Sequence, residues 1–200
     1  ARSVGDKTPQ LMVAEIADYK AIPIDGAMGD QPSVDPAGKR IVYVQNGGLH
    51  IWHEDGGRVQ QITEGGVLQD GQPRFSQDGK FLVFTRYADD TNGDGKLDGD
   101  DRATVWQLSL EVQSSDRPKE NYQIIPLTSA NYSAYSPQLR PPYLYLGLQT
   151  GEGLDVFRLP AFGQAKPLGD FEQLVSSLDQ VQDFQEKLFL IRRTQSAWAI

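Results

Sequence analysis

The sequence contains no cysteine and only two histidines among its 200 residues. The absence of cysteine excludes a disulfide framework and a thiol nucleophile, although it does not fix the compartment. No apolar run approaches the roughly 20 residues that a membrane-spanning helix needs. Lysine and arginine (19) are outnumbered by aspartate and glutamate (27), giving a formal net charge of −8. This balance argues against nucleic acid and against an anionic membrane surface as partners.

Recognisable catalytic motifs are also missing. His50 and His53 lie three residues apart in an apolar segment. On a strand this odd spacing places them on opposite faces, so they cannot easily share a metal ion, and we expect both to be structural. The sequence has no G-x-S-x-G nucleophile elbow and no Gly-rich phosphate loop. It therefore predicts no catalytic residues and a protein that is not an enzyme.

The densest chemical signal is the acidic, glycine-rich segment Ala88–Arg102. Six of its residues occupy positions 1, 3, 5, 7, 9 and 12 of a D-x-N-x-D-G calcium loop: Asp90, Asn92, Asp94, Lys96, Asp98 and Asp101. Gly95 stands at position 6, where the loop bends sharply and a residue must tolerate positive φ. Side-chain oxygens and the carbonyl of residue 7 are the donors that Ca²⁺ prefers, and without a cation the crowded aspartates would repel one another.

We therefore predict one bound Ca²⁺ in this loop. Aspartate at position 12 is shorter than the usual bidentate glutamate, which predicts modest affinity. The alternative interpretation is a solvated acidic loop without a metal.

The segments on either side of the loop indicate what kind of element carries it. The loop resembles those of EF-hands and, more closely, of dockerins, but a dockerin needs a helix after its loop. Here Phe81–Tyr87 and Ala103–Leu110 are rich in β-branched and aromatic residues, which favour strands. The sequence thus predicts a β-hairpin whose tip is tied by the metal ion.

Short apolar segments separated by turn residues recur along the chain, which predicts antiparallel four-stranded meanders. Gly38 and Gly79 occupy matching turns 41 residues apart, a spacing typical of propeller blades. The third unit has Pro141-Pro142 in place of the Gly turn, and a weak fourth strand is expected near Ala165–Leu168. The predicted units are 31–64, 72–129, 131–169 and 174–200, the last completed by 10–25.

The repeat resembles a known family. Pro32–Val44 and Pro73–Phe84 are similar to the Pro-Asp-Gly repeats of TolB-type β-propellers, and the units close with Ile62-Thr63 and Leu127-Thr128 as that family's do. The resemblance is clear over about Gln31–Thr128 and faint afterwards. Some repeats of the family carry a D-x-N-x-D-G loop at the same hairpin. The resemblance implies a periplasmic or otherwise extracytoplasmic protein that joins an envelope complex.

The fold expected is all-β, a small propeller of about four blades in one domain covering residues 1–200. Each blade has two apolar faces and cannot stand alone, so the blades must stack. Two arrangements remain open. The strands at 10–25 could pair with those at 174–200 and close the ring, or the chain could be part of a larger propeller. The chain begins Ala-Arg-Ser without methionine, as expected of a processed product or a fragment.

The function expected from these observations is a non-catalytic scaffold that binds Ca²⁺ and a protein partner. One alternative is the gating propeller of a prolyl-oligopeptidase-like hydrolase. Another is a sugar- or peptide-binding module built on an aromatic cluster, Tyr132, Tyr135, Tyr143 and Tyr145. The identity of the partner and the oligomeric state are not indicated by the sequence.

Overall fold

The computed structural model describes residues 9–14, 20–110, 122–140, 142–150, 153–160, 172–178, 180–184, 187–194 and 197–199; from residue 150 onward it describes the side chains of 155–158 only. This part of the chain is built of β-strands, with one short 3₁₀ turn, η1 (Asp55–Gly57), and no α-helix. The described residues contain no helix that is long and apolar enough to cross a membrane.

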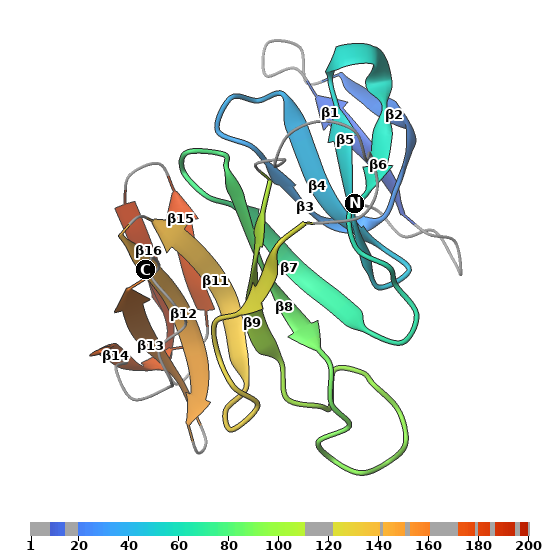
Figure 1. The fold of residues 1–200 in the computed structure, drawn as a ribbon. Helices are drawn as coiled ribbons and strands as arrows, with labels where there is room; N and C mark the ends of the chain where they lie inside the picture. Colours follow the sequence, from blue (N-terminus) through green and yellow to red (C-terminus); the bar gives the residue numbers. More distant parts are fainter. Residues whose placement is uncertain are drawn as a thin grey trace.

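The described strands form five antiparallel sheets, which stand side by side in chain order (Figure 1). Sheet 1 consists of β1 (Gln10–Ala14) and β2 (Ala21–Met28). Sheet 2 consists of β3 (Asp30–Val34), β4 (Arg40–Gln45), β5 (Gly48–His53) and β6 (Val59–Gln61). Sheet 3 consists of β7 (Gln69–Phe75), β8 (Phe81–Tyr87), β9 (Thr104–Ser109) and β10 (Ile124–Pro126).

Sheet 4 consists of β11 (Ala134–Arg140), β12 (Tyr143–Thr150), β13 (Gly153–Pro160) and β14 (Glu172–Leu178). Sheet 5 consists of β15 (Gln180–Phe184), β16 (Lys187–Thr194) and β17 (Ala197–Ala199). In sheets 2, 3 and 4 each strand pairs with the next along the chain, so each is a four-stranded meander. This is the blade topology that the repeat predicts.

Sheets 2 and 3 have matching turns between their first and second strands. Gly38 and Gly79 both have positive φ (72° and 69°) and end the turn between the first two strands. In the first turn Asp35 Oδ1 accepts hydrogen bonds from the backbone N–H groups of Lys39 and Arg40. In the second turn Ser76 Oγ accepts one from the N–H of Phe81. Different side chains therefore cap the same turn.

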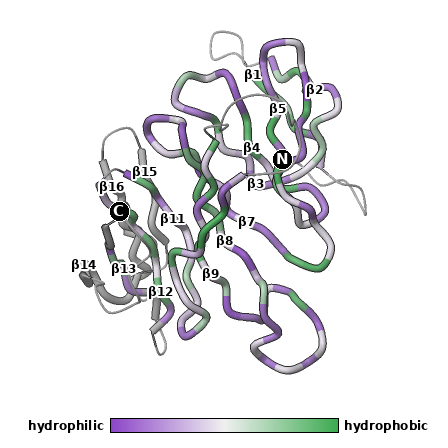
Figure 2. Tube along the Cα trace, viewed as in Figure 1, coloured by the Kyte–Doolittle hydropathy of each residue, from purple (hydrophilic) through white to green (hydrophobic). Residues whose placement is uncertain are grey.

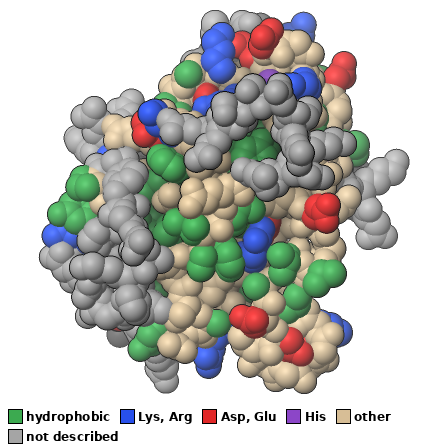
Figure 3. Space-filling model, in the orientation of Figure 1, with side chains coloured by type: hydrophobic (Ala, Val, Ile, Leu, Met, Phe, Trp, Pro, Cys, Tyr) green, Lys and Arg blue, Asp and Glu red, His purple; other side chains and the backbone are tan. Residues whose placement is uncertain are grey.

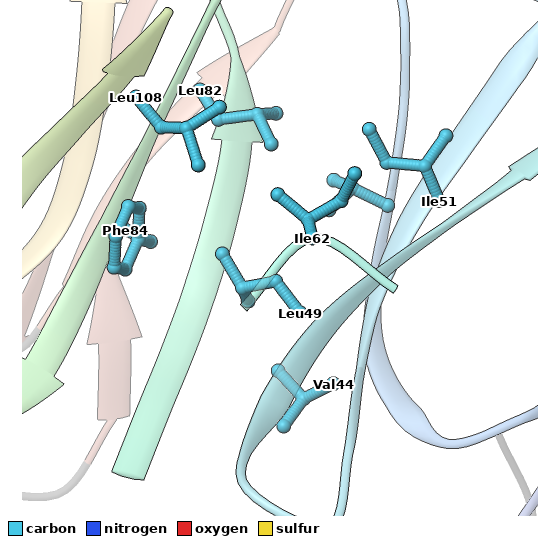
Figure 4. Packing of buried hydrophobic residues seen from close by; sticks show 8 residues of the cluster. Val44, Leu49, Ile51, Ile62, Leu82, Phe84 and Leu108 are labelled. Atoms are coloured by element: carbon cyan, nitrogen blue, oxygen red, sulfur yellow. The ribbon is translucent and has the colours of Figure 1, made fainter. Parts of the chain in front are cut away.

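The hydrophobic core lies between the sheets. Strand alternation turns Val42 and Val44 of sheet 2 toward sheet 3, where they form one buried cluster with Leu82, Phe84 and Leu108. Figure 4 shows Val44 on the side of sheet 2 and these three residues on the side of sheet 3. Phe84, Leu82 and Leu108 are fully buried. Figure 2 shows that apolar residues concentrate in the central strands, while the loops are polar. The inter-sheet layer is thus the main apolar contact of the fold.

Both faces of sheet 3 are covered. Val83 and Val105 point to the opposite face from Leu82 and Phe84 and pack on Leu144 and Leu146 of sheet 4, as part of a second buried cluster. A third cluster joins sheets 1 and 2 through Leu11, Ile24, Ala27 and Tyr43. Sheets 1 to 4 therefore depend on their neighbours for burial, as the repeat requires.

A repeated irregularity marks the first strand of sheets 2, 3 and 4. Gln31, Gln72 and Ser136 each have positive φ, between 48° and 51°, and each lies where the strand register shifts. Gln31 Oε1 accepts a hydrogen bond from Gln72 N (2.5 Å), and Gln72 Oε1 accepts one from Ser136 N (2.7 Å). The register shifts are β-bulges in β3, β7 and β11, and the two hydrogen bonds connect the three sheets at these bulges.

The strands at the two ends of the array bear on ring closure, which the sequence left open, and on the expected border of the last unit. β1 and β2 form a sheet of their own, and β15–β17 form another, so the N- and C-terminal strands do not pair and the sheets are not closed into a ring. Residues 174–178, expected to open a fourth unit, belong to β14, which pairs with β13 and completes sheet 4. The border between these units therefore follows Leu178. The strand expected near Ala165–Leu168 lies outside the described residues.

Candidate functional site

The predicted calcium loop connects β8 to β9 and projects from sheet 3 at the lower right of Figure 1. β8 and β9 pair from Phe81 opposite Ser109 to Arg86 opposite Thr104. The hairpin expected around the loop is therefore present. Acidic side chains show on this projection in the space-filling view (Figure 3).

The first half of the loop is ordered by side-chain caps. Asp90 accepts hydrogen bonds from the backbone N–H groups of Gly93 (2.7 Å), Asp94 (3.1 Å) and Gly95 (2.8 Å). Asn92 Oδ1 accepts one from Asp94 N, and Asp94 Oδ1 accepts one from Lys96 N. Gly95 has φ +82°, the bend expected at position 6.

Asp101 holds the second half of the loop against the first. It is 2% exposed, and its Oδ1 accepts hydrogen bonds from Thr91 N, Thr91 Oγ1 and Asn92 N. Its Oδ2 accepts one from Asp98 N (3.1 Å). Burial alone would raise the pKa of this carboxyl, but these hydrogen bonds hold it below its ordinary value.

The donor set of the loop fits Ca²⁺, but the carboxylates do not yet surround one point. Among the described residues, no group of three or more aspartate, glutamate or histidine side chains is arranged to hold a metal ion. The oxygens accept backbone N–H bonds instead, although a carboxylate oxygen keeps a further lone pair. The structure thus joins Asp90, Asn92, Asp94, Asp98 and Asp101 in one hydrogen-bonded loop, and metal binding by it stays a prediction.

A cleft of about 730 Å³ lies beside the loop. It is bordered by the starts of β3 and β7, by the β4–β5 turn and by the end of the loop at Leu97, Asp98 and Gly99. Most of its polar side chains are uncharged amides and hydroxyls: Gln31, Gln45, Asn46, Gln69, Gln72, Thr85 and Tyr87. Its volume falls in the range usual for ligand sites.

Asp70, which lines the cleft, belongs to a buried ion pair with Arg86. Arg86 donates two hydrogen bonds to Asp70, from Nε to Oδ1 (2.6 Å) and from Nη2 to Oδ2 (2.9 Å). Thr63 Oγ1 donates a further bond to Asp70 (2.6 Å), and the Arg86 guanidinium lies over the rings of Phe84 and Trp106. The Asp70 charge is therefore compensated.

The two histidines have structural partners. His50 stacks on Tyr43 with 5.7 Å between ring centroids, and His53 Nε2 lies 3.3 Å from Gln60 Oε1. Burial lowers the pKa of both below the ordinary histidine value. In the register they stand opposite Tyr43 and Arg40, which are three residues apart on β4 and so on opposite faces.

Two members of the predicted tyrosine cluster are in contact in the structure. Tyr143 and Tyr145 contact each other edge-on, and Arg158 lies over the Tyr143 ring at 4.6 Å. Tyr135 stands opposite Gly147, toward the other end of the same strand pair. Of the four tyrosines, a ring contact joins Tyr143 and Tyr145, and a binding surface built from all four stays a prediction.

No protein-family model and no curated protein matches the sequence. The fold does resemble solved structures. A tricorn protease matches with a TM-score of 0.61 and 13% identity, over 88% of this chain and 21% of that one. A prolyl endopeptidase matches with a TM-score of 0.59 and 16% identity, over 94% and 28%.

A putative TolB from Agrobacterium tumefaciens matches with a TM-score of 0.51 and 14% identity, over 80% of this chain and 58% of that one. The chain therefore spans less than two thirds of the length of each of these proteins, from 21% to 58%. At such low identities the likeness establishes the fold alone. This fold is all-β and TolB-like, of the propeller type.

The cleft is the part of the site that sequence reasoning did not find. Its residues come from six segments spread between Pro9 and Gly99, and glutamine and asparagine carry no distinctive spacing. The one available signal was the Gln-Pro pair that opens both clear repeats, Gln31-Pro32 and Gln72-Pro73. Both glutamines line the cleft.

Proposed function

We propose that this chain is a non-catalytic propeller module that binds a protein partner and carries one Ca²⁺ in the β8–β9 loop. The observation that carries the proposal is the juxtaposition of the two features. Asp98, at position 9 of the loop, also lines the amide-rich cleft. A bound ion would thereby fix one wall of a surface suited to polypeptide.

Within this proposal each loop residue has a defined part. Asp90, Asn92, Asp94, Asp98 and Asp101 offer side-chain oxygens, and Lys96 offers its carbonyl. A bound Ca²⁺ would supply charge neutralisation for these aspartates and so favour the ordered loop. The resemblance to TolB-type repeats supports an extracytoplasmic location, where free calcium is high enough for a site of modest affinity.

The calcium part is tested by thermal unfolding with excess Ca²⁺, with Mg²⁺ and with EDTA. We expect Ca²⁺ to raise the melting temperature, because an ion that binds only the native state stabilises it by mass action. Asp94→Ala should abolish the difference between Ca²⁺ and EDTA. Asp89→Ala removes an equal charge from outside the six ligand positions and should keep it. Identical melts of the unmodified chain in Ca²⁺ and EDTA would contradict a bound ion.

A second role is favoured by the likeness to a tricorn protease and a prolyl endopeptidase. In that case the chain would be the propeller part of a longer peptidase. The two roles differ in one measurable respect. We expect no hydrolysis of peptide substrates by the isolated chain in either case, but only in the second would adding it to its peptidase part change which peptide lengths are cleaved.

A further inference from the structure

Arg74 is the one arginine in the wall of the cleft. It lies on β7, is partly buried, and its Nη1 donates a single hydrogen bond to the carbonyl oxygen of its neighbour Pro73 (2.9 Å). In the part of the chain that the structure describes, no carboxylate pairs with it. A guanidinium has five N–H donors, so most of its bonding capacity is unused.

Two other buried or partly buried arginines of sheets 2 and 3 do pair with a carboxylate. Arg40 pairs with Asp35 through Nε at 2.9 Å, and Arg86 pairs with Asp70 at 2.6 Å. Arg74 has no such anion, and its burial lowers its pKa from the ordinary value with no carboxylate opposing the shift. Partial burial of a cation without a counter-charge costs free energy, which an anion bound from outside would offset.

The remaining lining selects among possible anions. Asp30 and Asp98 also border the cleft and would repel a multiply charged ligand such as a phosphate ester or nucleic acid. A ligand that carries a single carboxylate at Arg74 would meet less of this electrostatic repulsion. The volume of about 730 Å³ also exceeds what a small inorganic anion fills.

The walls offer what a peptide backbone needs. β3 and β7 are the edge strands of their sheets, so each has one backbone edge that no strand of its own sheet covers. Amide side chains such as Gln45, Asn46 and Gln69 can both donate and accept hydrogen bonds, as peptide groups require. Proteins that bind extended peptides often do so through the free edge of such a strand.

We propose that the cleft binds the C-terminal end of an extended peptide, with its free carboxylate anchored by the Arg74 guanidinium. The inference rests on the proposed protein-binding role, because it names the chemistry of the partner. Arginine suits this task since its planar fork matches a carboxylate with two parallel hydrogen bonds.

The experiment uses the full chain and two probes, trialanine with a free C-terminus and trialanine amide, followed by ¹⁵N–¹H NMR. The free acid is expected to shift the amide signals of Gly71 and Gln72 and their neighbours in the cleft. The amide form should bind at least about tenfold more weakly, because it lacks the charge-assisted hydrogen bonds. Arg74→Gln should weaken binding of the free acid by a similar factor, whereas Arg58→Gln, on an exposed turn outside the cleft, should leave it unchanged.

Three results would overturn the inference. The first is equal binding of the two peptide forms to the unmodified protein, which does not depend on any variant folding. The second is the same set of shifts with inorganic phosphate while both peptides give none, which would identify a general anion site. The third is no shift with either peptide at about 10 mM, a concentration well above the dissociation constant expected of a weak specific site. A Ca²⁺ titration of the same sample reports on Asp90–Asp101 and so tests the metal proposal separately.

Discussion

Asp70 and Arg86 form a pair whose side chains are 0% and 9% exposed. Removing one partner from such a pair leaves an uncompensated buried charge. We expect Asp70→Asn to lower the free energy of unfolding by roughly 3–5 kcal/mol, measured by urea denaturation.

The chain contains its own control for that change. Ala134 and Leu148 occupy in sheet 4 the register positions that Asp70 and Arg86 occupy in sheet 3. The double variant Asp70→Ala, Arg86→Leu copies this apolar pair and should lose less stability than Asp70→Asn alone. The single variants Asp70→Ala and Arg86→Leu complete the comparison. If the double variant loses as much stability as these two single variants added together, the two charges are not coupled.

The histidines make a prediction about pH. Burial lowers the pKa of His50 and His53 in the folded chain, so the unfolded chain takes up protons first as the pH falls. Stability is therefore complete above the unfolded histidine pKa of about 6.5 and declines as the pH drops through and below that value. Urea denaturation between about pH 7.5 and 5.5 measures this slope, and the variant His50→Gln, His53→Gln should flatten it. If the slope is unchanged in the double variant, the pH dependence of stability arises from titratable groups other than these two histidines.

At the scale of single elements, the proposed metal ligands of the β8–β9 loop differ in how much they stabilise the loop without a metal ion. Asp101 accepts four hydrogen bonds from residues of its own loop and is almost fully buried, whereas Asp94 is exposed and accepts one from Lys96 N. Asp101→Asn should therefore cost about 1–3 kcal/mol even in EDTA, because an amide group would face the N–H of Asp98. Asp94→Ala should have little effect in EDTA. Chemical denaturation of both variants in EDTA measures the difference, and equal losses would contradict this difference between the two carboxylates.

The sequence predicted the repeated elements well where local chemistry decides them. Gly38 and Gly79 mark turns that need positive φ, and the alternation in Phe81–Tyr87 turns Leu82 and Phe84 to one face and Val83 to the other. The closure of the array was not predictable in this way. Whether β1 pairs with a distant strand depends on how far each sheet rotates relative to the next, and no residue of β1 or β2 encodes that angle. The cleft was missed for the same reason, since Arg74, Asn46 and Asp98 meet only after the sheets have stacked.

At the scale of the whole molecule, stability should vary along the array, because sheets are held by their neighbours. Sheet 3 buries Leu82 and Phe84 on one face and Val83 and Val105 on the other. Sheet 1 has two strands, packs on sheet 2 through Leu11, Ile24 and Ala27, and leaves Met12 and Val13 about half exposed. In stacked repeats the free energy of local opening follows the number and quality of such interfaces.

Amide hydrogen exchange should therefore be slowest in β8 and β9 and faster in β1 and β2. Val83→Ala removes buried methyl groups from the layer between sheets 3 and 4 only. It should speed exchange in β8, β9 and β12 while leaving β1 and β2 nearly unchanged, since their contacts lie two interfaces away. Val34→Ala, at a residue 57% exposed on β3, is the matched control and should change little. Uniform exchange across all described strands would instead mean that the sheets open as one cooperative unit.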